Sequence, residues 1–174
     1  GKYQVYYRQS LNGGASWDDP VLLADDVSCS GYQRYGPSPV ITSIYPGPAV
    51  CELVAVWVTS SGLRYRLWYY GHWESTTGTL DDGSYNDNVW FPSIMGHGSW
   101  ASLTYDTRFY GVYSRKFNGS SWSSRSRVDD ASTICDRISQ VAVAPDNTVL
   151  AVWEAQKSGD SDYRIIYREG YSDN

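Results

Sequence analysis

The chain has 174 residues, a length that normally forms one domain with its own hydrophobic core. Its formal net charge of −5 leaves no basic stripe to neutralise phosphates, so we expect no nucleic-acid partner. No apolar run approaches the roughly 20 residues of a membrane-spanning helix, and we expect no membrane partner. The 16 Tyr and 8 Trp residues, against 3 Phe and 1 Met, favour β-strands and surfaces that stack on sugars.

The first two predicted strands, residues 2–9 and 20–25, are joined by a Gly-rich polar segment that is typical of a hairpin. Asn12 is expected to accept backbone N–H bonds within the turn. Gly14 would supply a positive φ, and Trp17 would fold back as a buried plug. The residues that form this pattern are Ser10, Asn12, Gly14, Ser16 and Trp17.

This pattern resembles an Asp-box, the bacterial neuraminidase (BNR) repeat of sialidases and many other β-propellers, with Asn12 in the usual Asp place. In that family, the box joins the two outer strands of a blade and lies at the periphery, away from the active site. The resemblance therefore implies a sialidase-like β-propeller and a structural role for the box. A shorter version follows at Asn118, Gly119 and Trp122, where we expect the same Asn-centred turn and buried Trp.

The remaining predicted strands follow in chain order as repeats of four, labelled A to D from the axis of a propeller outward. The first whole blade is expected at residues 39–42, 53–58, 65–70 and 78–81. The second is expected at 90–95, 101–105, 109–115 and 124–128. The last unit has strands at 138–144, 149–154 and 163–168. Helical periodicity is not evident anywhere in the chain.

Two sequence markers repeat at nearly constant spacing. A large aromatic residue ends the second strand of each unit, in steps of 48 residues (105 − 57 and 153 − 105), at Trp57, Tyr105 and Trp153. Paired aspartates close an outer strand, in steps of 56 and 48 residues, at Asp26, Asp82 and Asp130. Arg8 and Arg168 also recur at one position of strand C, where we expect them to be structural.

The sequence therefore predicts an all-β fold, a β-propeller of four-stranded antiparallel blades with roughly three blades in a single partial domain over residues 1–174. The expected units are 1–26 (outer strands C and D only), 27–82, 83–130 and 131–174 (strands A to C). This is about half of a six-bladed ring. The further blades would come from the rest of a longer chain, since the sequence begins at Gly1 without Met, or from a second copy in a homodimer.

Candidate ligand-binding residues lie on the loops that face the axis of a propeller. Arg34, with Tyr35 beside it, and Arg137 fall in equivalent D–A loops, and two arginines facing one axis would bind a carboxylate bidentately. Asp106 and Glu154 begin equivalent B–C loops and would supply acid/base carboxylates. The alternative is that the arginines form ion pairs on a solvated rim and that the carboxylates are turn residues.

The sequence predicts no metal site and no cofactor. Cys29, Cys51 and Cys135 lack the Cys-x-x-Cys spacing of zinc ligands. A disulfide between Cys29 and Cys51 and partly buried free thiols both stay open as alternatives.

The leading functional hypothesis is an extracellular or cell-surface module for recognition or structure, non-catalytic and with a glycan as its ligand. The resemblance to sialidases implies three arginines, a Tyr nucleophile with a Glu partner and an Asp acid, and this sequence matches none of them by motif. One alternative is that the chain is part of a sialidase-type glycoside hydrolase. A second alternative is a purely architectural subunit of a surface assembly.

Overall fold

The computed structural model describes residues 2–28, 37–44, 52–81, 89–107, 111–130, 133–157, 159 and 161–171. All of the regular secondary structure among these residues is β-strand. The strands are β1 (Lys2–Tyr7), β2 (Val21–Ser28), β3 (Val40–Ser43), β4 (Leu53–Thr59), β5 (Gly62–Tyr69), β6 (His72–Trp73), β7 (Gly78–Asp81), β8 (Val89–His97), β9 (Trp100–Thr107), β10 (Gly111–Phe117), β11 (Ser126–Arg127), β12 (Thr133–Val143), β13 (Thr148–Lys157) and β14 (Arg164–Tyr171).

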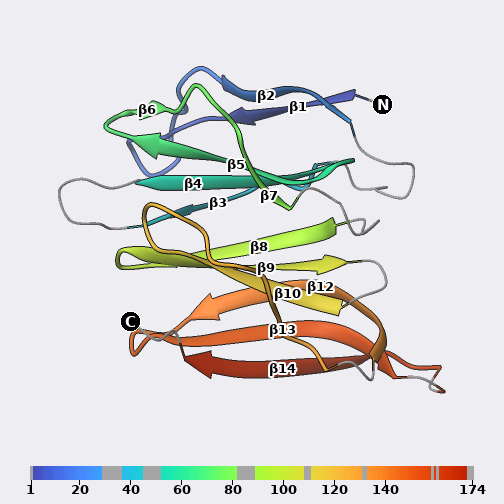
Figure 1. Cartoon of the computed structure of the whole chain (residues 1–174). Coiled ribbons are helices and arrows are strands. Elements are labelled where there is room, and N and C mark those ends of the chain that lie inside the picture. The colour runs from blue at the N-terminus through green and yellow to red at the C-terminus, as the bar shows by residue number, and fades with distance from the viewer. Residues whose placement is uncertain are drawn as a thin grey trace.

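The strands form four antiparallel sheets in chain order: β1–β2, then β3–β4–β5 with β6 and β7 both on β5, then β8–β9–β10–β11, then β12–β13–β14. Every strand predicted from the sequence overlaps an observed one. The sheets stack one on the next, from β1–β2 at one end to β12–β14 at the other (Figure 1). The chain therefore folds as all-β, in antiparallel β-propeller blades, with roughly three blades present.

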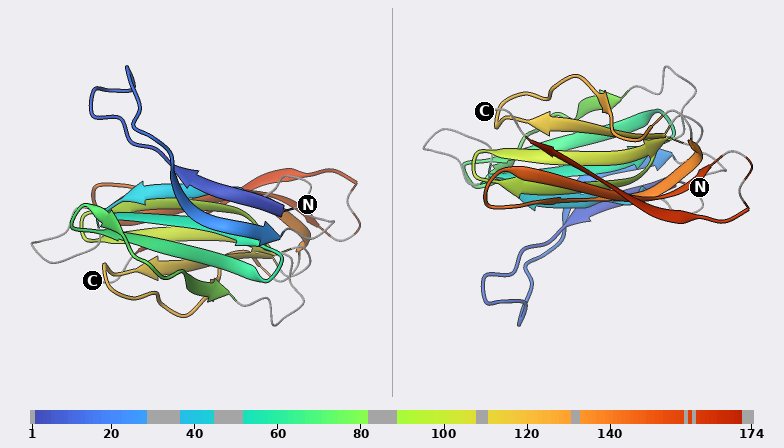
Figure 2. Two further views of the ribbon diagram at one scale, coloured as in Figure 1. Left: turned by 90° about the horizontal axis from the view of Figure 1, so that it is seen from above. Right: turned by 90° about the horizontal axis from the view of Figure 1, so that it is seen from below.

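The first strand of each whole sheet lies beside the first strand of the next, since β3 contacts β8 and β8 contacts β12. These strands occupy the place of the innermost strands of a propeller, and each sheet continues outward from them. Neighbouring sheets pack face to face (Figure 2).

Each gap between successive sheets has its own apolar core. The repeat aromatics Trp57, Tyr105 and Trp153 are buried on β4, β9 and β13. The gap between the β3–β7 and β8–β11 sheets is the most apolar, because Val54 and Val56 pack there against the second of these sheets. Alternation of side chains along a strand places one set of residues in the gap before the sheet and the other set in the gap after it.

The hydrogen bonds predicted for the two Asn-centred turns are confirmed. The Asn12 side-chain oxygen accepts the Ser16 N–H at 2.9 Å. The Asn118 oxygen accepts the N–H groups of Ser120 and Ser121 at 3.0 and 2.8 Å. A short polar side chain thus satisfies the backbone donors of each turn.

The predicted burial of Trp17 is wrong, because this side chain is 55% exposed. The connection between β1 and β2, which carries Trp17, projects away from the stacked sheets (Figure 2). Trp122 differs, since its turn stays on the sheet and its ring lies 5.0 Å from the Phe117 ring. Trp122 is half-buried there.

Candidate functional site

The structure brings two of the predicted ligand-binding residues together. Arg137 and Glu154 face each other across β12 and β13, with Nε and Oε2 2.9 Å apart. The Arg137 guanidinium also lies 4.0 Å from the ring centre of Tyr163. The structure therefore supports the ion-pair interpretation of Arg137, with Glu154 as its partner, and a ligand role for either residue stays a prediction.

The other predicted residues lie elsewhere. Asp106 is fully buried on β9, and its Oδ1 accepts the backbone N–H of Ser139, on the neighbouring sheet, at 3.1 Å. Its carboxylate therefore joins two blades. Arg34 and Tyr35 lie outside the described residues. Cys29 and Cys51, for which a disulfide was an alternative, also lie outside them.

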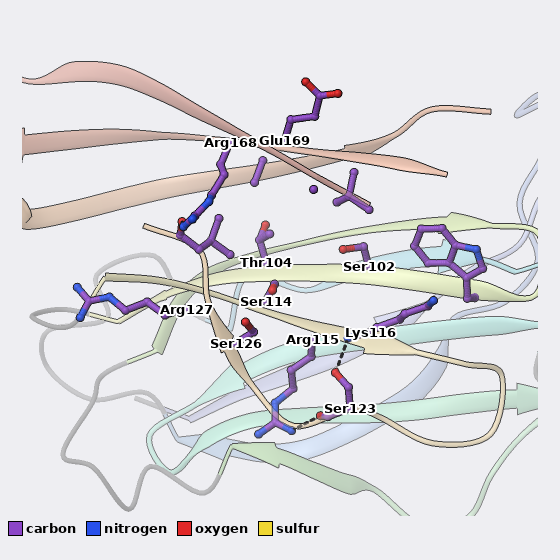
Figure 3. Close-up of a pocket in the computed structure, with 15 residues that line it drawn as sticks. Ser102, Thr104, Ser114, Arg115, Lys116, Ser123, Ser126, Arg127, Arg168 and Glu169 are labelled. Atoms are coloured by element: carbon purple, nitrogen blue, oxygen red, sulfur yellow. Dashed lines mark hydrogen bonds between the residues drawn. The ribbon is translucent and has the colours of Figure 1, made fainter. Parts of the chain in front are cut away.

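A groove with a volume of about 450 Å³ lies between the β8–β11 sheet and the β12–β14 sheet (Figure 3). Side chains of the first sheet form its floor, and strands β13 and β14 form the opposite wall. Five of its lining residues carry hydroxyl groups: Ser102, Thr104, Ser114, Ser123 and Ser126.

The floor belongs to a row of hydroxyl groups that crosses all strands of the β8–β11 sheet, and the members on β9, β10 and β11 line the groove. Ser93 pairs with Thr104, Thr104 with Ser114, and Ser114 with Ser126. Directly paired residues on one face of a sheet have their side chains about 5 Å apart. The row therefore presents evenly spaced donors and acceptors toward the neighbouring sheet.

Thr104, in the middle of this row, is fully buried, and its hydroxyl has no hydrogen-bond partner among the described residues. A buried hydroxyl without a partner costs about 1–3 kcal/mol. Native structures avoid this cost unless a water or a ligand completes the bond. In Figure 3, Thr104 lies with Ser102 and Ser114 at the centre of the groove.

Two of the hydroxyl groups on the floor replace apolar residues that stand at the same positions in the preceding blade. Counting back from the repeat aromatics, Ser102 and Thr104 stand where the previous blade has Val54 and Val56. Those valines are fully buried in the apolar gap between sheets. The same strand position thus builds a core in one gap and a polar surface in the next.

The space for the groove comes from a second difference between the blades. Trp68 pairs with Leu53, Phe117 with Ala101, and Gly170 with Val149, so these three residues occupy one position of strand C. Trp68 packs with its neighbours at ring distances of 5.4 and 5.7 Å, and Phe117 is fully buried. A Cβ placed on Gly170 would have no atom within 4 Å. Glycine at this position leaves open the volume that an aromatic ring fills in the other gaps.

Charged side chains border the groove. The Lys116 ammonium lies 4.9 Å from the ring centre of Trp100, which also lines the groove. Arg168 on β14 donates a 2.5 Å hydrogen bond to the Val128 carbonyl.

The equivalent arginine of the first unit, Arg8, donates to the Trp17 and Asp18 carbonyls at 3.1 and 2.6 Å. Both arginines are structural, as predicted, but Arg168 also lines the groove.

None of these groove residues was predicted as a ligand-binding residue, and Arg168 was predicted only as structural. The predicted site consisted of charged residues on axial loops, whereas the groove lies between the faces of two sheets. The usable signal was the comparison of repeats, which shows hydroxyl groups in place of valine and glycine in place of an aromatic residue.

Two further findings concern the described residues. They contain no cluster of three or more side chains suited to holding a metal ion. They also contain no helix with the length and apolarity needed to cross a membrane.

No protein-family model matches the sequence, and no curated protein matches it. Among solved structures, the chain is similar to the Aleuria aurantia lectin. One structure is a mutant of that lectin in complex with Fucα1-6GlcNAc, with 16% identity and a TM-score of 0.47. Another is described as a six-bladed β-propeller with a novel mode of fucose recognition, with 16% identity and a TM-score of 0.45.

Each match covers 93% of this chain and 55% of the lectin chain, so the chain spans about half the length of these lectins. At this identity and TM-score, nothing about the binding residues of this chain follows from the likeness.

Proposed function

We propose that this chain is a non-catalytic carbohydrate-binding module of a β-propeller, with the sugar bound in the groove between the β8–β11 and β12–β14 sheets. The observation that carries the proposal is the row of hydroxyl groups on the groove floor, in which Ser114 is half-buried, Ser126 is exposed and the Thr104 hydroxyl has no partner among the described residues. Each hydroxyl of a saccharide both donates and accepts, so such a row complements it. The volume of about 450 Å³ lies in the usual range of small-molecule sites.

Binding fits the groove better than glycoside hydrolysis does. Hydrolysis of a glycoside usually requires two carboxyl groups about 5–9.5 Å apart. Among the residues that line the groove, Glu169 is the sole carboxylate, and it points away from the floor in Figure 3. The sialidase-type hydrolase stays the rival proposal, supported by the Asn-centred turns at Asn12 and Asn118.

We further propose that the protein acts outside the cell or at its surface, where glycans are displayed, and that another blade packs on its last sheet. The outer face of the β12–β14 sheet supports the second point, because Ile165 and Tyr167 are 74% and 69% exposed there. A large exposed apolar face usually marks an interaction site. That blade would come from the rest of a longer chain or from a second copy, and light scattering at micromolar concentration separates the two.

The test is a glycan array probed with the wild-type chain and with a double variant, Ser102→Val with Thr104→Val. The variant inserts the valines of the preceding blade and removes two of the five hydroxyl groups that line the groove without opening a cavity. Thr79→Val, at an exposed hydroxyl on β7, is the matched control. We expect saccharide binding by the wild type and the control, and loss of binding in the double variant. Absence of binding by the wild type, or full binding by the double variant, would refute the proposal.

A further inference from the structure

We infer that the groove selects a saccharide that carries a negative charge, as the carboxylate of a uronic acid unit or as a sulfate ester. The inference rests on the proposed function, because it concerns the ligand of the same groove. It comes from the distribution of charge around the hydroxyl floor.

The groove is cationic in a protein that is anionic as a whole. The chain has 14 Lys and Arg residues against 19 Asp and Glu residues, for a net charge of −5. The residues that line the groove include four cations, Arg115, Lys116, Arg127 and Arg168, and one carboxylate, Glu169. A cleft lined by one sign of charge concentrates ligands of the other sign.

Two of these arginines hold neutral partners. Arg115 donates to the Ser123 carbonyl at 2.7 Å, and Arg168 donates to the Val128 carbonyl. No ion pair is found for either residue within the described part of the chain. Their positive charges are therefore not neutralised by a protein carboxylate.

Arg127 shows the contrasting arrangement. Its Nε and Nη2 donate to the two carboxylate oxygens of the buried Asp129 at 3.0 and 2.7 Å. A bidentate pair of this kind satisfies the charge and the geometry of the guanidinium. Arg127 is thus engaged by the protein itself. Arg115 pairs with Leu103, so its side chain lies on the face of the sheet opposite Lys116 and points away from the hydroxyl row in Figure 3. Arg168 keeps its charge available to the groove.

Lys116 and Arg168 approach the hydroxyl floor from opposite sheets. Lys116 pairs with Ser102 across β10 and β9, and it shares the face of the sheet that carries the hydroxyl row. Arg168 lies on β14, on the opposite wall (Figure 3). A saccharide on the floor would lie between the two cations. An anionic substituent there would form charge-assisted hydrogen bonds, which are about twice as strong as neutral ones.

The test is an array of matched saccharides, in which each neutral hexose oligosaccharide is paired with its uronate and its 6-O-sulfated counterparts. We expect the acidic members to bind about tenfold or more tightly than the neutral ones at low salt, with the difference shrinking at about 0.5 M salt. The uronate and sulfate arms show which anion is preferred, and preference for either one supports the inference.

Lys116→Gln and Arg168→Gln should each reduce this preference, and Arg168→Lys should keep most of it. Arg164→Gln is the matched control, since Arg164 lies on the same strand but does not line the groove. Binding of neutral saccharides with no gain from either anion would overturn the inference and leave the proposed function standing. If no saccharide binds, the proposed function fails and the inference fails with it.

Discussion

Gly170 occupies on β14 the position that Trp68 occupies on β5, because each pairs with the residue four positions before the repeat aromatic of its blade. The other whole blade has Phe117 at this position. One substitution between repeats thus separates a filled gap from an open groove. The relationship explains why a groove of about 450 Å³ lies between the last two sheets.

Gly170→Phe should fill the groove and abolish saccharide binding while the chain stays folded. The backbone at Gly170 is not in the left-handed region, and the equivalent position accepts an aromatic ring in two blades. Gly170→Ala is the control, because a Cβ there meets no atom within 4 Å. Calorimetric titration with a bound saccharide measures the effect. Unchanged affinity in the Phe variant would place the binding site elsewhere.

Thr104→Val should raise the free energy of unfolding by about 1 kcal/mol while weakening saccharide binding. The variant removes a buried hydroxyl that has no partner in the described part of the chain, and it inserts the residue found at the equivalent position, Val56. Urea denaturation measures the stability. A loss of stability would show instead that the Thr104 hydroxyl has a structural role.

Trp57→Ala should lower the free energy of unfolding much more than Trp17→Ala does. Trp57 is 1% exposed in the core between two sheets, and its truncation should cost about 3–5 kcal/mol. Trp17 is 55% exposed on the projecting hairpin, and its truncation should cost about 0.5 kcal/mol or less. Comparable losses in urea denaturation would mean that the hairpin packs on the sheets in solution.

Tyr105 should make the protein less stable in strongly alkaline solution. Burial, as the main cause, raises the pKa of Tyr105 from 10.0 to about 12. The unfolded chain therefore loses the phenol proton first, and stability falls as the pH rises from about 10 toward 12. Ultraviolet titration of phenolate, compared with Tyr105→Phe, measures this. The same pH dependence of unfolding in the variant and the wild type would show that Tyr105 is not the group responsible.

The sheets could be predicted from sequence because their signals are local. Alternating apolar residues and the spacing of Trp57, Tyr105 and Trp153 locate the strands. Asn12 and Asn118 were also predictable, because an Asx turn involves residues only a few positions apart. The exposure of Trp17 was not predictable, because it depends on whether the hairpin packs on a sheet or projects away from it.

The groove could not be predicted because it results from residues far apart in the chain. Thr104 and Gly170 come together only when two sheets stack, and the hydroxyl of Thr104 matters only once its burial is known. The candidates Arg137 and Glu154 were found from repeat positions, and the structure pairs them with each other. Side-chain chemistry alone does not tell an ion pair from a ligand site.

A crystal structure of the chain with a saccharide that it binds in solution would locate the binding site directly. We expect the saccharide to lie between the β8–β11 and β12–β14 sheets, with its hydroxyl groups hydrogen-bonded to the hydroxyl row at Ser114 and Ser126 and its ring over the space beside Gly170. A saccharide bound instead at Arg137 and Glu154, with the groove unchanged, would contradict this expectation.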